Sequence, residues 1–266
     1  MNKKFPTYIK IFEETQRILK DIKSICSRNK EIDEVDELLF YLAGNINLRM
    51  NTIFHLLENN ITDGVFPLQR TLFELIVAFN AFINATDKTV YVKFFNKKHD
   101  FETFNKLNKY FESDNEIIKS IATSEEIELL AHFKNVSLEQ IKSENLKVNR
   151  PEFKQWYEIA SGKSLKELSA EFQELSYYQF YDEPSNWVHP QRLIENMDFE
   201  TFSQQMPLPL YTFIIGNAFC STLELLSNIA LLVDYYNIEE LEGISEYGEK
   251  LLELANHLKL LVKIDD

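Results

Sequence analysis

Two charged residues, Arg70 and Glu74, occur in an otherwise apolar segment and are the first candidates for chemistry. Their spacing of four residues places them on one face of a helix. An arginine there can bind a phosphate group while the glutamate holds it in position. The alternative is a buried ion pair that fixes the helix register, because unpaired buried charges are unfavourable. Both interpretations predict a further partner from another helix.

A second group of polar side chains lies in the segment YDEPSNWVHP, which contains Tyr181, Ser185 and His189. One helical turn would bring the hydroxyl of Ser185 and the imidazole of His189 onto the same face. Histidine is the side chain best suited to proton transfer near neutral pH. The sequence lacks a GxSxG elbow, so it does not predict a catalytic serine triad. The structural alternative is a core histidine that is hydrogen-bonded through Ser185 or a carbonyl group.

A third candidate is Arg49 with His55, separated by five residues. This is the spacing of the metal-independent ribonucleases of the higher eukaryotes and prokaryotes nucleotide-binding (HEPN) class. In such a pair, arginine steadies the phosphate while histidine moves a proton from the 2′-hydroxyl. On a regular helix the two side chains lie well apart around the axis, and Met50 replaces the usual polar residue. We therefore treat this pair as a weaker alternative.

The other histidines, His99, His132 and His257, are expected on helix surfaces. No histidine occurs with a carboxylate at HExxH or similar metal spacing, and there is no glycine-rich phosphate loop. We therefore predict neither a metal nor another cofactor.

The composition indicates an all-α protein. The 266 residues include six glycines and seven prolines, which favours long helices over a turn-rich β-protein. The formal net charge of −14 argues against a general polyanion binder but is compatible with a local basic site. Cys26 and Cys220 are far apart and lack metal-ligand spacing, and the chain begins without a signal-peptide pattern, so we expect a cytoplasmic protein.

The hydrophobic pattern predicts a multi-helix bundle around a buried central helix at about residues 64–85. A helix at residues 35–59 should form a hairpin with it, and Asp33 or Asp36 can cap that helix. A helix at residues 5–28 and helices at 209–263 should pack on this core. We expect one all-helical domain over residues 1–266.

The apolar run from Leu208 to Val233 is long enough to suggest a membrane span. It contains Asn217, Glu224 and Asn228, however, which are unfavourable in hydrocarbon. We therefore predict a core helix and no membrane association.

Three stretches resemble a bacterial all-helical family of unknown function: LRMNTIFHLLENNITDGVFPLQRTLFELIVAFNAFI, KQWYEIASGKSLKELSAEF and YYQFYDEPSNWVHP. The resemblance covers about residues 38–190, with an R-x3-E helix and an S-x3-H turn as its specific motifs. It implies that Arg70, Glu74, Tyr181, Ser185 and His189 meet in one polar cluster. The family is similar to HEPN-like helical bundles of phage-defence and toxin–antitoxin systems. That similarity implies a dimer presenting Arg and His across a cleft.

These observations lead to the hypothesis of a metal-independent, HEPN-like RNA-cleaving effector. Arg70 would bind phosphate, Glu74 would orient it and His189 would transfer the proton, with Tyr181 and Ser185 in support. The expected partners are RNA and either a second copy or a partner protein. The competing hypothesis is a non-catalytic helical scaffold whose polar cluster is architectural, and a third is a small-molecule sensor with an aromatic pocket.

Overall fold

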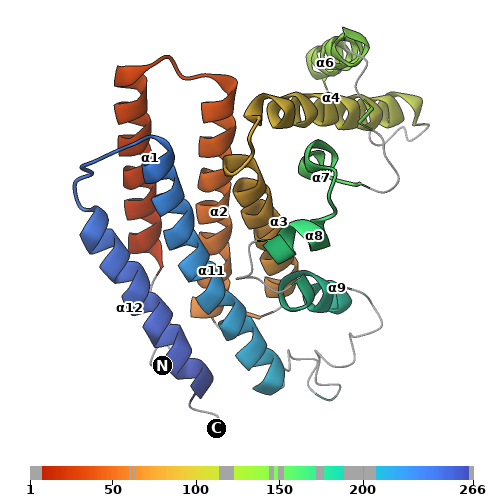
Figure 1. The fold of residues 1–266 in the computed structure, drawn as a ribbon. Coiled ribbons are helices and arrows are strands. Elements are labelled where there is room, and N and C mark those ends of the chain that lie inside the picture. The colour runs from red at the N-terminus through yellow and green to blue at the C-terminus, as the bar shows by residue number, and fades with distance from the viewer. Residues whose placement is uncertain are drawn as a thin grey trace. The chain divides into compact units, whose positions relative to one another are not determined.

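In the computed structural model, the chain is described at residues 8–59, 61–62, 64–113, 123–143, 147–148, 153–171, 177–188, 200 and 208–263. These residues form helices and no strands, as the all-α prediction requires (Figure 1). The chain divides into two compact units, one made of residues 1–85 and 165–266 and the other of residues 86–164. The single-domain organisation stays a prediction.

The larger unit begins with three long helices, α1 (Ile9–Asn29), α2 (Glu34–Glu58) and α3 (Val65–Ile83). The side chain of Asp33 accepts a hydrogen bond from the Asp36 backbone N–H, and the side chain of Asp36 accepts one from the Asp33 backbone N–H. This reciprocal capping box begins α2 where the sequence predicted a cap. A short connection then leads into α3, which packs along α2 as expected for a helical hairpin.

Helix α3 is the buried centre of this unit, as predicted. It begins after Gly64, whose φ of 81° lies in the left-handed region that glycine adopts without strain. Almost all of its C-terminal half is buried, including Val77, Phe79 and Phe82. Helix α2 and four later elements surround it, namely α8 (Leu165–Glu171), η1 (Tyr178–Asp182), α9 (Glu183–Val188) and α11 (Leu208–Tyr235).

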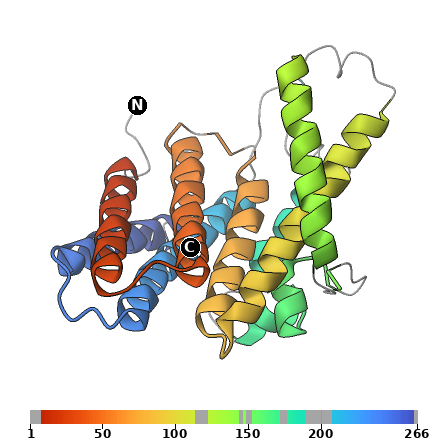
Figure 2. The same ribbon diagram turned by 90° about the horizontal axis from the view of Figure 1, so that it is seen from above.

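Helix α12 (Ile244–Lys263) packs along α11 and contacts α1 (Figures 1 and 2). These two C-terminal helices confirm the predicted helical region at 209–263. Short element η1 is a five-residue π-helix, which the sequence did not predict. Such wider turns are uncommon in proteins and often occur at functional sites.

The smaller unit contains α4 (Lys88–Glu112), α6 (Ser124–Ser143) and α7 (Trp156–Ser161). The indole ring of Trp156 packs edge-on against Tyr91 and Phe95 of α4. Lys97 of α4 donates to the Gln140 carbonyl and to Ser143 at the end of α6. These contacts hold the unit together within its own residues.

Among the residues that the structure describes, two helical stretches, Val65–Ile83 and Thr212–Tyr235, are long and apolar enough to cross a membrane by length and composition. Of their apolar windows, 67% and 56% respectively are buried inside the protein. Core helices of soluble proteins share these properties, so neither helix is assigned to a membrane.

Candidate functional site

The structure brings Arg70 and Glu74 of α3 together with Tyr181 of η1. Arg70 Nε lies 3.5 Å from a Glu74 carboxylate oxygen, and Arg70 Nη2 donates to the Tyr181 hydroxyl at 2.7 Å. The guanidinium carbon also lies 4.4 Å from the centroid of the Tyr181 ring, within cation–π range. The third partner predicted for the Arg70–Glu74 pair is therefore Tyr181, whose position in sequence is more than a hundred residues away.

The Tyr181 ring is itself held by neighbouring aromatic side chains. Its centroid lies 5.0 Å from that of Tyr177 and 6.2 Å from that of Phe73 on α3. Phe180, one residue earlier, is buried. Its ring stacks on the ring of Phe73, with the two centroids 6.0 Å apart. The π-helix thus anchors Phe180 in the core and places Tyr181 against Arg70.

Ser185 joins the cluster through its hydroxyl, which donates to the Tyr181 backbone carbonyl. This bond ties α9 to the preceding π-helix and makes Ser185 a supporting residue. His189 follows the last residue of α9 and lies outside the described residues. The expected approach of His189 to Arg70 therefore stays a prediction.

The Arg70–Glu74 pair is less buried than its apolar surroundings in the sequence led us to expect. Its side chains keep 35% and 24% of their surface exposed. The N-terminal half of α3 buries Val65, Phe66 and Gln69 but leaves the stripe through Arg70, Thr71 and Glu74 half-exposed. The pair is accordingly reachable from solvent, which a ligand site needs, and it is not a sealed core ion pair.

A largely buried network of amide side chains lies next to these residues. Asn217 of α11 donates to Gln69 Oε1 at 3.3 Å and accepts from Gln179 Nε2 at 2.9 Å. Gln69 also donates to the Ile214 carbonyl at 2.9 Å. The network joins α3, η1 and α11 directly beside Arg70 and Tyr181. The sequence marked Asn217 as a polar residue in an apolar run, but its partners were not predicted.

Replacing Asn217 with alanine is expected to lower the free energy of unfolding by about 2 kcal/mol, because the buried Gln69 amide and the half-buried Gln179 amide each lose a hydrogen bond to Asn217. Urea denaturation measures this change. Asn45→Ala is the matched control, because among the described residues the Asn45 amide donates only to the carbonyl of Tyr41 on its own helix. A change for Asn217→Ala no larger than for the control would show that the network does not stabilise this region.

The second predicted pair, Arg49 and His55, lies on α2. Arg49 is half-buried and its Nε atom has no hydrogen-bond partner among the described residues, whereas His55 is exposed. Within the described part of α2 no contact joins the two side chains, as expected for residues so far apart around a helix axis. The described residues also contain no group of three or more His, Cys, Asp or Glu side chains that could hold a metal ion.

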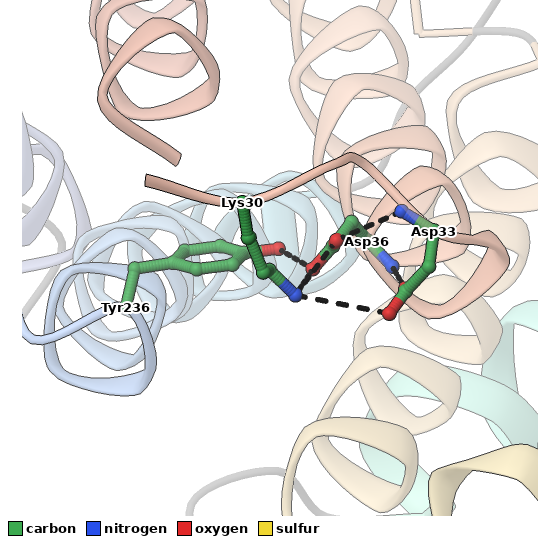
Figure 3. Close-up of polar contacts among 4 residues, drawn as sticks. All are labelled: Lys30, Asp33, Asp36 and Tyr236. Carbon is green, nitrogen blue, oxygen red and sulfur yellow. Dashed lines mark hydrogen bonds and ion pairs between the residues drawn. The ribbon is translucent and has the colours of Figure 1, made fainter. Parts of the chain in front are cut away.

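A different polar cluster, missed by the sequence analysis, is centred on the fully buried carboxylate of Asp36 (Figure 3). Lys30 Nζ lies 2.8 Å from each of the Asp36 carboxylate oxygens, and the Tyr236 hydroxyl donates to Oδ1 at 2.9 Å. The Asp33 backbone N–H donates to Oδ2 at 3.0 Å. Both carboxylate oxygens are thus occupied, so this cluster is an architectural link between the ends of α1, α2 and α11.

Burial by itself would raise the pKa of Asp36, but the hydrogen bonds from Lys30, Asp33 and Tyr236 outweigh it and hold the pKa below its usual value. For Lys30, burial favours the neutral form, yet the bond to Asp36 raises the pKa above normal. Burial and the Asp36 charge raise the pKa of Tyr236 far above its ordinary value. Asp36 and Lys30 are therefore ionised at neutral pH, while Tyr236 remains protonated.

The fold and the cluster define an all-α protein with a half-exposed arginine held on a tyrosine ring. Residues 36–205 match the model of a family of unknown function (DUF5677). Because this match spans well over half of the chain, the protein belongs to that family. No curated protein and no solved structure matches the chain significantly. The predicted membership of an uncharacterised family is thus confirmed. The matched residues include Arg70, Glu74, Tyr181 and Ser185, which together are called the Arg70 cluster.

Proposed function

We propose that this protein is a metal-independent RNA-cleaving effector of a bacterial defence or toxin–antitoxin system, similar to HEPN-like proteins. The observation that carries the proposal is the presentation of Arg70. Its guanidinium group is held by the Tyr181 ring and hydroxyl while about a third of the side chain is exposed. A pre-oriented guanidinium is well suited to bind a phosphate group.

Donor groups remain for such a ligand. Within the described part of the chain, Arg70 contacts only Glu74 and Tyr181, which leaves most of its five N–H donors for an anion. The Tyr181 hydroxyl accepts from Arg70 and so retains its own proton for donation. These two residues can therefore donate to neighbouring oxygens of one phosphate.

A second cation lies beside this pair and adds to the local positive charge. The ammonium group of Lys166, on α8, lies 6.0 Å from the Tyr177 ring centroid, and Tyr177 packs against Tyr181. Arg70 and Lys166 thus flank two adjacent tyrosine rings. Such a local basic site is compatible with a phosphodiester substrate despite the net charge of −14.

The proposed reaction uses the 2′-hydroxyl of RNA as its nucleophile, so it needs no metal-bound water. His189 takes the proton as the 2′-oxygen bonds to phosphorus, and the bond from phosphorus to the 5′-oxygen breaks. The leaving 5′-oxygen takes a proton from solvent, and the other product ends in a 2′,3′-cyclic phosphate. Arg70 stabilises the charge that develops on the phosphate oxygens, with Glu74 holding Arg70 in position.

Purified protein is expected to cleave single-stranded RNA in the presence of EDTA and to leave 2′,3′-cyclic phosphate ends, which electrophoresis and mass spectrometry detect. DNA of the same sequence is the matched control, because it lacks the 2′-hydroxyl and should stay intact. His189→Ala should lower the cleavage rate by roughly a hundredfold or more. Absence of RNA cleavage, or equal cleavage of the DNA, would contradict the proposal.

The alternative function is a non-catalytic interaction protein, and one observation favours it. Within the described part of the chain, the polar contacts of Tyr181 and Ser185 and the Tyr181–Phe73 ring contact tie η1 and α9 to each other or to α3, as an architectural cluster would. Under this alternative the cluster holds a surface for a partner protein or a second copy. Substitution of Arg70 then affects stability and not RNA cleavage.

A further inference from the structure

A groove of about 460 Å³ lies in the larger unit where α11 ends and α12 begins. No residue of the Arg70 cluster contributes to it. Its volume is within the range of small-molecule sites, roughly 300–1,000 Å³. Most of its lining is aliphatic, from Leu226, Ile229, Ala230, Val233, Ile238 and Ile244.

A helix-capping motif builds one wall of this groove. Asn237 adopts a φ of 50°, the left-handed conformation that asparagine tolerates better than most residues. Its N–H donates to the Asp234 carbonyl at 2.9 Å, and the Ile238 N–H donates to the Val233 carbonyl at 3.0 Å. This is the Schellman pattern at a helix C-terminus, which folds Ile238 back toward Val233. The groove is therefore preformed by local backbone geometry.

The polar part of the lining is negative. Asp234 and Glu239 are exposed and line the groove, and its described lining residues include no lysine, arginine or histidine. The C-terminal end of the 28-residue helix α11 adds partial negative charge at the same place. Arg17, which contacts the backbone of Glu242 in the following turn, is already paired with Asp21. A cation is thus favoured over an anion in this groove.

We infer that the groove binds a small organic amine with an apolar body. The ammonium group would lie between the carboxylates of Asp234 and Glu239, where charge-assisted hydrogen bonds hold it. The apolar body would cover the aliphatic wall formed by Val233, Ile238 and their neighbours, which removes apolar surface from water. The inference is independent of the proposed RNA cleavage, because the two sites share no residue.

The matched probes are 4-phenylbutylamine and 4-phenylbutyrate, which share an apolar body and carry opposite charges. Isothermal titration calorimetry and saturation-transfer NMR with the full chain at pH 7 measure their binding. We expect the amine to bind at least tenfold more tightly than the acid. We also expect its affinity to fall as salt is added, because the two carboxylates are exposed.

Two variants locate the bound amine. Asp234→Asn combined with Glu239→Gln should weaken amine binding at least tenfold, and Ala230→Phe should abolish it by filling the groove. Glu102→Gln, which neutralises an exposed carboxylate on α4, is the control and should leave binding unchanged. Circular dichroism confirms that each variant is folded.

Three results would overturn the inference. The first is the absence of binding by the amine. The second is equal binding of the amine and the acid, which would mean that the carboxylates do not favour a cation over an anion. The third is amine binding that persists in the folded Asp234→Asn, Glu239→Gln chain, which would place the amine elsewhere.

Discussion

Replacing Arg70 with alanine is expected to slow RNA cleavage by roughly a hundredfold or more, because the proposed phosphate ligand is lost. The same change should lower the free energy of unfolding by only about 1 kcal/mol or less. Its ion pair with Glu74 is half-exposed, and such pairs contribute little to stability. Loss of activity in a chain that remains folded is therefore the expected combination. Cleavage kinetics and urea denaturation measure the two quantities.

Arg70→Lys provides a finer test at the same position. Lysine keeps the positive charge but loses the planar guanidinium that stacks on Tyr181 and donates from several nitrogens. We therefore expect a cleavage rate between those of the wild type and Arg70→Ala. An equally strong loss in both variants would assign the effect to guanidinium geometry more than to charge.

The control for Arg70 is Arg17→Ala. Arg17 also forms an ion pair with an acidic residue four positions later, Asp21, and its side chain is 45% exposed. Its removal should leave RNA cleavage unchanged. Full activity in a folded Arg70→Ala chain would exclude Arg70 from the site. A loss of stability of about 3 kcal/mol or more would instead favour the architectural alternative.

Replacing Asp36 with asparagine is expected to have the largest effect on stability, lowering the free energy of unfolding by about 3 kcal/mol. Asparagine is neutral, so Lys30 loses its counter-charge. It also carries only one carboxamide oxygen, whereas Lys30, Tyr236 and the Asp33 backbone all donate to the carboxylate. At roughly 2–4 °C per kcal/mol, Tm should fall by about 6–12 °C.

Asp21→Asn is the control for Asp36, because Asp21 pairs with Arg17 at 2.9 Å while remaining 43% exposed. Its effect should stay within about 0.5 kcal/mol. Equal effects of the two substitutions would mean that burial of the Asp36 carboxylate adds nothing to the strength of its contacts.

The stability difference between the wild type and Asp36→Asn should also depend on pH. The pKa of Asp36 is lower in the folded chain than its ordinary value of 3.8. The contribution of the Asp36 carboxylate to the free energy of unfolding is therefore present in full above about pH 4, and it is lost as the pH falls through the pKa of Asp36 in the folded chain. Urea midpoints at pH 7 and pH 3 should show the difference narrowing in acid. A difference that is the same at both pH values would contradict the lowered pKa.

Features that depend on neighbouring residues were predictable. The central helix follows from an apolar run of helical length between turn residues, and α3 was found there. The cap of α2 follows from Asp33 and Asp36, three residues apart at the start of a helix. The shared face of Arg70 and Glu74 follows from helix geometry alone. The meeting of Arg70 and Tyr181 was expected from the family resemblance and not from spacing.

The burial of Arg70 could not be predicted in the same way. An apolar helix is expected in the interior on all sides, but hydropathy does not specify which part of it the neighbouring elements leave uncovered. In the structure the stripe through Arg70 and Glu74 is that part. The ion pair that was expected to be buried is thus half-exposed, so its predicted contribution to the free energy of unfolding is smaller.

The all-α class, the central helix and the local contacts follow from the amino-acid sequence alone, because these depend on side-chain periodicity and on hydrogen bonds between near neighbours. The hydrogen bond from Tyr236 to Asp36, 200 positions apart, and the one from Asn217 to Gln69, 148 positions apart, are seen only in the folded chain. Such bonds depend on how helices pack and at what register. Helix packing brings distant residues together according to the shapes of whole helix surfaces. These shapes cannot be inferred from the spacing of residues within a short stretch of the chain.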